Sequence, residues 1–204
     1  MNIANAENKS RKFHHARGSE TTAPTRGFLK ISGAVKAFRY DFRGKTVLDI
    51  GSSTGGFTKL ALDLGAKKVV AVEKGTNQMS APLRFDPRVE LHEKTDIFDF
   101  ETSAADVIVA DVSFLSLTKI LSYAKNHLAR KDTDFLVMLK PQFEASPGDL
   151  NRGVVKNESI RRRILKDFEF WLKQSGFVII KKHDNELTGK TGNRERFYYL
   201  QLAK

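Results

Sequence analysis

Short apolar segments alternate with amphipathic ones along most of this sequence, and the alternation limits the folds open to it. The segments predicted as strands are 45–50, 67–73, 89–94, 105–111, 134–140, 176–183 and 196–202. The predicted helices are 26–38, 57–65, 117–128 and 158–175. Apolar strands separated by helices are typical of a parallel sheet with helices on both faces, so the sequence predicts an α/β fold. The last two strands have no helix between them, and an antiparallel C-terminal edge is expected there.

Composition divides the chain into an arm and one domain. Residues 1–25 are polar and basic with few apolar side chains, which predicts a mobile arm. Residues 26–204 are long enough for a single domain with a sizeable core. No apolar run approaches the roughly 18 residues needed to span a membrane, and the N-terminus lacks the apolar core of a secretory signal. The chain has no cysteine, which excludes disulfides, and a cytoplasmic location is expected.

The formal net charge of +11 is high for a chain of 204 residues. A large excess of Lys and Arg over Asp and Glu favours a polyanionic partner, because the basic side chains neutralise phosphates and release their counterions. The sequence therefore predicts nucleic acid as the partner. Histidines and carboxylates show no spacing typical of a metal site, and no metal is predicted.

A loop of small residues follows the first predicted strand, in "VLDIGSSTGGFT". Glycines between a strand and a helix let the backbone turn sharply and approach a ligand closely. No Gly-Lys-Ser/Thr follows, so the loop is not a P-loop and ATP hydrolysis is excluded. The residues predicted to bind a cofactor here are Gly51, Ser53, Thr54, Gly55, Gly56 and Phe57.

Three acidic residues lie near this loop in the predicted fold. Glu73 ends the second strand, where a carboxylate can accept hydrogen bonds from ribose hydroxyls; this serves NAD and S-adenosylmethionine equally. Asp49, inside the first strand, suits a cationic cofactor better than a pyrophosphate. Asp96 follows the third strand and is predicted to meet the adenine amine, although such a residue also commonly caps a turn.

Two further polar residues come where apolar strands stop. Asp111 ends "VIVAD" and Lys140 ends "FLVMLK", so both are predicted at the edge of the sheet where ligands bind. Pro141 favours an extended backbone at Lys140. If the two strands are neighbours, the side chains of Asp111 and Lys140 converge. A catalytic pair and a surface ion pair of little consequence are both open at this point.

Seven stretches together resemble one family. They are "TRGFLK", "LDIGSSTGGFT", "VVAVEKG", "VADVSFLSL", "MLKPQFE", "RGVV" and "TGNRERF". In this order they resemble the TlyA (haemolysin A) family of RNA 2′-O-methyltransferases, relatives of the FtsJ-type enzymes. The resemblance implies a Rossmann-like fold, S-adenosylmethionine as cofactor (Asp111 would also contact it), and RNA as substrate, with ribosomal RNA expected.

The resemblance also implies a Lys-Asp-Lys-Glu catalytic tetrad. Carried over by motif, its members are Lys30, Asp111, Lys140 and Glu195, with Glu186 as the alternative to Glu195. In the family's pattern Lys140 activates the ribose 2′-hydroxyl, Asp111 and Lys30 orient it, and Glu195 helps to hold the site. Such a transfer needs an aligned nucleophile, a base and cationic groups near the developing alkoxide, and it needs no metal.

Basic residues near the tetrad are predicted to bind RNA phosphates. They are Arg26, Lys190, Arg194 and Arg196. Segment 144–156 beside Lys140 is turn-rich and is predicted to close over the substrate as a flap. The family usually carries a small RNA-binding domain ahead of the methyltransferase, and residues 1–25 are too few and too polar to form one.

Three other functions stay open at this stage. The chain could be a non-catalytic RNA-binding or ribosome-assembly module that keeps the fold. It could be a nicotinamide-dependent oxidoreductase, because Glu73 suits that cofactor as well. The name haemolysin suggests a membrane-active protein, which the lack of any membrane-spanning run argues against.

Overall fold

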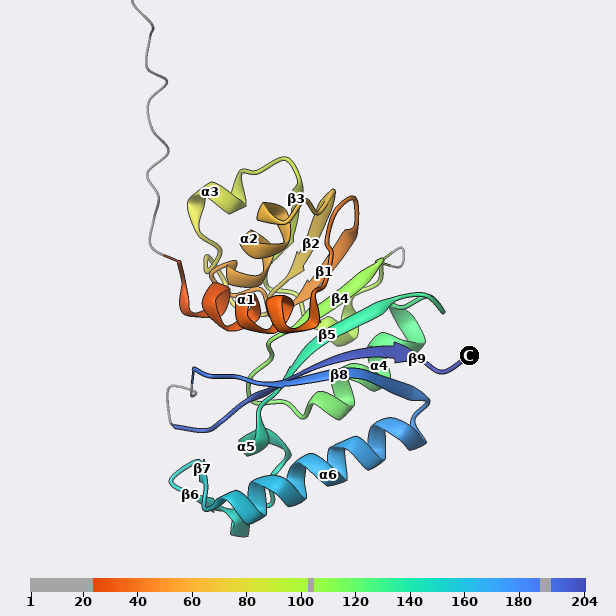
Figure 1. Ribbon diagram of the computed structural model, residues 1–204. Coiled ribbons are helices and arrows are strands. Elements are labelled where there is room, and N and C mark those ends of the chain that lie inside the picture. Colours follow the sequence, from red (N-terminus) through yellow and green to blue (C-terminus); the bar gives the residue numbers. More distant parts are fainter. Residues whose placement is uncertain (1–23, 103–104, 188–191) are drawn as a thin grey trace, which may run out of the picture.

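A seven-stranded sheet runs through the molecule in the order β3-β2-β1-β4-β5-β9-β8 (Figure 1). This computed structural model describes residues 24–102, 105–187 and 192–204. The strands of the sheet are β1 (Thr46–Ile50), β2 (Lys68–Val72), β3 (Val89–His92), β4 (Val107–Ala110), β5 (Asp134–Leu139), β8 (Phe177–Asp184) and β9 (Arg196–Leu202). The first five are mutually parallel, whereas β9 lies antiparallel between β5 and β8. The predicted α/β fold and its antiparallel C-terminal edge are confirmed.

Helices cover both faces of the sheet. They are α1 (Arg26–Phe38), α2 (Gly56–Asp63), α3 (Ala81–Arg84), α4 (Leu117–His127), α5 (Pro141–Glu144) and α6 (Glu158–Gln174). The four longer helices were predicted to within one or two residues. The four-residue helices α3 and α5 were not, because so short a segment shows no helical period. No helix within the described ranges is long and apolar enough to cross a membrane.

The strands have two apolar faces because neighbouring side chains point to opposite sides. On β1, Val47 packs into the core under α1 and α2, whereas Leu48 packs into the core under α4 and α6. Figure 1 shows these two helical layers on either side of the sheet. Both core positions are fully buried, which explains why the strands are apolar throughout.

Helix α1 begins at a side-chain cap. The hydroxyl oxygen of Thr25 accepts a hydrogen bond from the backbone N–H of Phe28 at 3.2 Å, so Thr25 belongs to the folded domain and not to the predicted arm. Ile31 and Phe38 bury the inner face of the helix against the sheet. Residues 1–23 of the predicted arm lie outside the described residues.

The carboxyl ends of β1, β2, β4 and β5 meet at one edge of the sheet, because the four strands are parallel neighbours. The residues that follow these ends are Gly51, Glu73, Asp111 and Lys140. In open α/β sheets, ligands bind at this edge, where the strand order reverses. The fold therefore brings these four predicted site residues to one edge of the sheet.

Candidate active site

The loop between β1 and α2 turns sharply at Gly51. Its φ is +78°, and a Cβ at this position would lie 3.0 Å from the carbonyl oxygen of Asp111. The backbone conformation and the close approach both favour glycine. The backbone N–H groups of Gly51 and Ser52 donate to the carbonyl of Val72 at 2.9 and 3.2 Å, which ties the loop to β2.

Two carboxylates lie beside this loop. Glu73 accepts a hydrogen bond from the backbone N–H of Ser53 at 2.9 Å and so holds the loop in place. Asp96 pairs with Lys74 at 2.8 Å, and the hydrogen bond from Lys74 lowers the pKa of Asp96, which is therefore ionised at neutral pH. Glu73 and Asp96 line the same cavity of about 560 Å³, which we call the carboxylate cavity.

A second cavity of about 660 Å³ lies next to the first. Its lining includes all four residues of the predicted tetrad, and we call it the lysine cavity. Five residues line both cavities: Gly51, Ser53, Asp111, Ser113 and Phe114. Two ligands bound in the two cavities would therefore meet at these residues. No group of His, Asp and Glu side chains within the described part of the chain could hold a metal ion.

The lysine cavity contains two lysine–carboxylate pairs. Lys30, on α1, lies with its Nζ 2.7 Å from Oε2 of Glu195, and the side chains are only 9% and 3% exposed. Glu195 precedes β9 and also accepts a hydrogen bond from Nδ2 of Asn185 at 3.3 Å. A buried pair of this kind is costly to break, because the remaining charge would have no partner.

The second pair joins the ends of β4 and β5. Nζ of Lys140 lies 2.7 Å from Oδ1 of Asp111 and donates to Oγ of Ser113, also at 2.7 Å. The backbone of Lys140 is extended (φ −105°, ψ 102°), as expected for a residue before Pro141. Adjacent strands thus bring the two side chains together, and the pair lies in a cavity rather than on an open surface.

The remaining loop residues divide between the cavity and the protein interior. Thr54, Gly56 and Phe57 line the lysine cavity and not the carboxylate cavity, although all three were predicted as cofactor contacts. Gly55 lines neither: a Cβ there would overlap the side chains of Leu83 and Met79. The glycine at this position allows close packing against α3, and this geometry does not favour the predicted approach to a ligand.

Asp49 lies beneath the loop and lines neither cavity. Its side chain is fully buried, and Oδ2 accepts a hydrogen bond from the Thr58 hydroxyl at 2.7 Å. Burial raises the pKa of Asp49 to about 7. The geometry favours a role in supporting the loop over the predicted direct contact with a cofactor.

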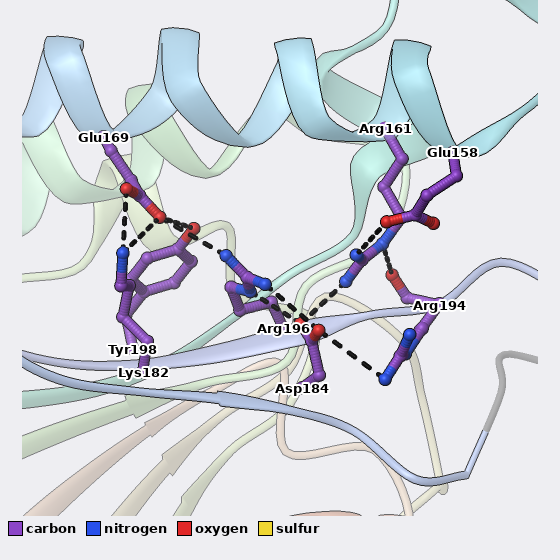
Figure 2. Close-up of polar contacts among 8 residues, drawn as sticks. All are labelled: Glu158, Arg161, Glu169, Lys182, Asp184, Arg194, Arg196 and Tyr198. Atoms are coloured by element: carbon purple, nitrogen blue, oxygen red, sulfur yellow. Dashed lines mark hydrogen bonds and ion pairs between the residues drawn. The ribbon is translucent and has the colours of Figure 1, made fainter.

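The residues predicted to bind RNA do not all lie together in the structure. Arg26 lines the lysine cavity, and Lys190 lies outside the described residues. Arg196 points away from the cavity: its Nε donates to Oδ1 of Asp184 at 2.6 Å, within a group of ion pairs between α6 and the C-terminal strands (Figure 2). The members of this group, the α6 cluster, are Glu158, Arg161, Glu169, Lys182, Asp184, Arg194, Arg196 and Tyr198. A structural role for Arg196 is thereby favoured over the predicted contact with RNA, whereas the side chain of Arg194 is 54% exposed.

Sequence reasoning missed several residues of the lysine cavity. Ser113 and Phe114 lie two and three residues after Asp111, and Gln142 and Phe143 lie two and three residues after Lys140. Phe114 is 88% exposed with φ +66°, and its ring centroid lies 5.4 Å from that of Phe143. Their position just after two strand ends was a signal, but exposure and backbone conformation cannot be read from the sequence.

Comparisons with known proteins show which family the chain resembles. Residues 23–202 match the FtsJ-like methyltransferase family. The 16S/23S rRNA (cytidine-2′-O)-methyltransferase TlyA of Mycobacterium tuberculosis is 37% identical over 188 residues, which are 90% of this chain and 70% of the relative. A solved structure described as a hemolysin from Streptococcus thermophilus superposes with a TM-score of 0.85 at 32% identity, covering 92% of this chain and 70% of the other.

A more distant structure supports the fold alone. A solved structure described as an S-adenosylmethionine-dependent methyltransferase from Listeria monocytogenes has a TM-score of 0.64 at 17% identity, over 88% of this chain and 99% of that one. The sheet order, the glycine loop and the paired lysines therefore occur in a chain whose relatives are methyltransferases. The chain belongs to the FtsJ-like methyltransferase family, within its TlyA (haemolysin A) group.

Proposed function

We propose that this protein methylates the ribose 2′-hydroxyl of RNA, with ribosomal RNA as substrate and S-adenosylmethionine as methyl donor. One observation carries the proposal: the pairs Lys30–Glu195 and Lys140–Asp111 line a single cavity. The name of the M. tuberculosis relative supports a cytidine 2′-hydroxyl in ribosomal RNA as the target. The net charge of +11 suits a polyanionic substrate.

The carboxylate cavity has the chemistry that S-adenosylmethionine requires. Glu73 and Asp96 offer acceptors for ribose hydroxyls and for the adenine amine, and Gly51 allows a ligand to approach the backbone. The cofactor supplies a methyl group on a cationic sulfur, a charge that nearby carboxylates favour. In the adjoining lysine cavity the hydroxyl of Ser52 is buried and has no hydrogen-bond partner among the described residues, so it is available to a ligand.

The lysine cavity supplies the groups that activate a hydroxyl. We assign to Nζ of Lys140 the removal of the 2′-hydroxyl proton as a general base, a role for which Lys140 must first give up its own proton and become a neutral amine. Asp111 and Ser113 hold that nitrogen in position at 2.7 Å each. Lys30, fixed by Glu195, brings positive charge to the cavity in which negative charge develops on the oxygen.

The proposed catalytic unit is a single methyltransferase domain over residues 26–204, preceded by a basic arm. The family match over residues 23–202 supports this extent. With ribosomal RNA as substrate, the proposed location is the cytoplasm.

The proposal is tested by incubating the protein with ribosomal RNA and S-adenosylmethionine labelled in its methyl group. We expect the wild type to label RNA at a ribose 2′-oxygen, located by resistance to alkaline cleavage, and Lys140→Ala to lose that labelling. Binding of S-adenosylmethionine is followed separately through the melting temperature. A wild type that binds the cofactor but labels no RNA would favour the non-catalytic RNA-binding module. A melting temperature raised by NAD and not by S-adenosylmethionine would overturn the assignment of the cofactor.

A further inference from the structure

A small hairpin carries a strained arginine at the rim of the lysine cavity. Strands β6 (Leu150–Asn151) and β7 (Val154–Val155) are joined by Arg152 and Gly153. Both turn residues have positive φ, +48° for Arg152 and +80° for Gly153, as in a type I′ hairpin turn. Asparagine, aspartate or glycine is usual at the first position of this turn, because an arginine pays a steric penalty there.

The hairpin is fixed beside the proposed catalytic residues. Nδ2 of Asn193 donates to the carbonyl of Gly153 at 3.0 Å, and Oδ1 of Asn193 accepts from the backbone N–H of Val155 at 2.9 Å. Asn193 is 3% exposed and comes two residues before Glu195. Gly153 itself lines the lysine cavity. Figure 1 shows the hairpin next to α5 and the first turn of α6. The position of Arg152 is therefore set relative to the cavity.

The guanidinium group of Arg152 makes no ion pair with the described part of the protein. Its side chain is exposed, and no residue in the described ranges provides it with a hydrogen bond or an ion pair. The arginines nearby differ: Arg163 pairs with Asp149 at 2.6 Å, and Arg194 and Arg196 both pair with Asp184. An arginine that lacks an internal partner, in a backbone conformation that disfavours it, is explained best by a ligand outside the protein.

We propose that Arg152 binds a backbone phosphate of the RNA next to the target ribose, and that the β6–β7 hairpin positions the strand over the lysine cavity. The inference rests on RNA being the substrate, as proposed above. A guanidinium presents parallel N–H donors that match two phosphate oxygens, which lysine cannot do. Phosphate contacts fix register and orientation without reading sequence. Arg152 would thus place the ribose without taking part in the chemistry.

The test compares Arg152→Asn with Arg43→Asn. Asparagine suits the turn, so the first variant keeps the hairpin and removes only the charge. Arg43 is 81% exposed and precedes β1, at the opposite edge of the sheet, so its replacement removes the same charge far from the cavity. Binding to a labelled single-stranded oligoribonucleotide is measured from low to moderate salt, and methylation of ribosomal RNA is measured with both variants.

We expect Arg152→Asn to weaken RNA binding and raise the KM for RNA about tenfold, with kcat unchanged. The slope of log affinity against log salt should fall in magnitude by about 0.7, the share of one phosphate on a single strand. The melting temperature should equal or exceed that of the wild type, because the strain is relieved. Arg43→Asn should change none of these quantities by as much, and Arg152→Lys should restore part of the affinity.

Wild-type binding and wild-type salt dependence in Arg152→Asn would overturn the inference, and so would a loss confined to kcat. Methylation by the wild type decides the proposed function separately. If the wild type binds RNA without methylating it, the salt dependence of the two variants still decides the role of Arg152. If the wild type binds no RNA, both proposals fall.

Discussion

Two neighbouring residues, Glu195 and Arg196, belong to two clusters of charge on opposite sides of the C-terminal strands. Glu195 pairs with Lys30 in the lysine cavity. Arg196 pairs with Asp184 and Glu169 in the α6 cluster, which fills the space between α6 and the sheet (Figure 2). The alternation of side chains along a strand is enough to separate them.

The two clusters differ in how completely their polar atoms are satisfied. In the α6 cluster, Glu169 accepts hydrogen bonds from Lys182, Arg196 and Tyr198. In the lysine cavity, Ser52 Oγ and Gln142 Oε1 are buried with no hydrogen-bond partner among the described residues. Unsatisfied buried atoms cost stability, so they are retained where a ligand completes them. The comparison favours a structural role for the α6 cluster and supports the proposed substrate-binding role of the lysine cavity.

The largest effect is expected from Lys140→Arg. Arginine keeps the positive charge and can still pair with Asp111, but it cannot give up its proton to become a base. We expect kcat to fall by about 10² to 10⁴, the usual contribution of a general base. The measurement is methyl transfer to RNA at saturating cofactor, with the melting temperature as the control for folding. Activity within tenfold of the wild type would show that the charge alone is sufficient, and Lys140 would not be the base.

A second prediction concerns two aspartates whose pKa values move in opposite directions. Burial raises the pKa of Asp49 to about 7. For Asp184 burial acts in the same direction, but hydrogen bonds from Arg196 and Arg161 outweigh it and lower the pKa to about 2. Stability from Asp49 is therefore complete below its unfolded pKa of about 4 and is lost as the pH rises to 7. Stability from Asp184 is complete above about 4 and is lost as the pH falls to 2.

Asp49→Asn tests the first of these two directions. The amide cannot ionise, so the variant should lose the decline in stability between pH 4 and 7, which is on the order of 3 kcal/mol in the wild type. The measurement is the free energy of unfolding in urea at several pH values. An unchanged pH dependence in Asp49→Asn would mean that another group titrates in this range. Asp184→Asn, as the matched control, should lower the stability at neutral pH and lose the decline between pH 4 and 2, and it should leave the change between pH 4 and 7 as in the wild type.

Arg196→Met removes the central cation of the α6 cluster. The side chains of Arg196 and Asp184 are 20% and 22% exposed, so solvent screens the pair in part. We expect a loss of about 2 kcal/mol in the free energy of unfolding, below the value for a fully buried pair. The kcat of the folded fraction should stay at the wild-type level. A variant that keeps its stability and loses activity would assign Arg196 to the substrate side, as the sequence had predicted.

The sequence predicted the edge of the sheet better than it predicted the partners of charged residues. Asp111 and Lys140 were found because an apolar strand that ends in a charge marks the edge of a parallel sheet. Their convergence was expected if the two strands were neighbours, whereas Lys30 and Glu195 were assigned to the site by a motif alone, and their pairing with each other was not predicted. Both pairs are present in the structure, whereas their catalytic roles stay a prediction.

Two predictions that the geometry does not favour share a physical cause. Arg196 was predicted to contact RNA because its charge is visible in the sequence, whereas its partner Asp184 becomes a neighbour only when β8 pairs with β9. Gly55 was assigned to the ligand because glycine allows close approach, but the approaching group is α3, which is too short to predict. Tertiary contacts decide which charged side chain or glycine remains available to a ligand, and a single sequence does not show these contacts.

The smallest effect is expected at Arg194, the exposed end of the α6 cluster. Its Nη2 lies 3.7 Å from Asp184 and 54% of its side chain is exposed, so the pair contributes under about 0.5 kcal/mol. Arg194→Ala should leave the free energy of unfolding unchanged within that range. If Arg194 contacts RNA as predicted, RNA affinity should fall about threefold and the salt dependence should weaken by about one phosphate. A stability loss as large as that of Arg196→Met would show that Arg194, like Arg196, stabilises the fold. Among residues 194–196, only Glu195 would then remain on the side of the proposed substrate.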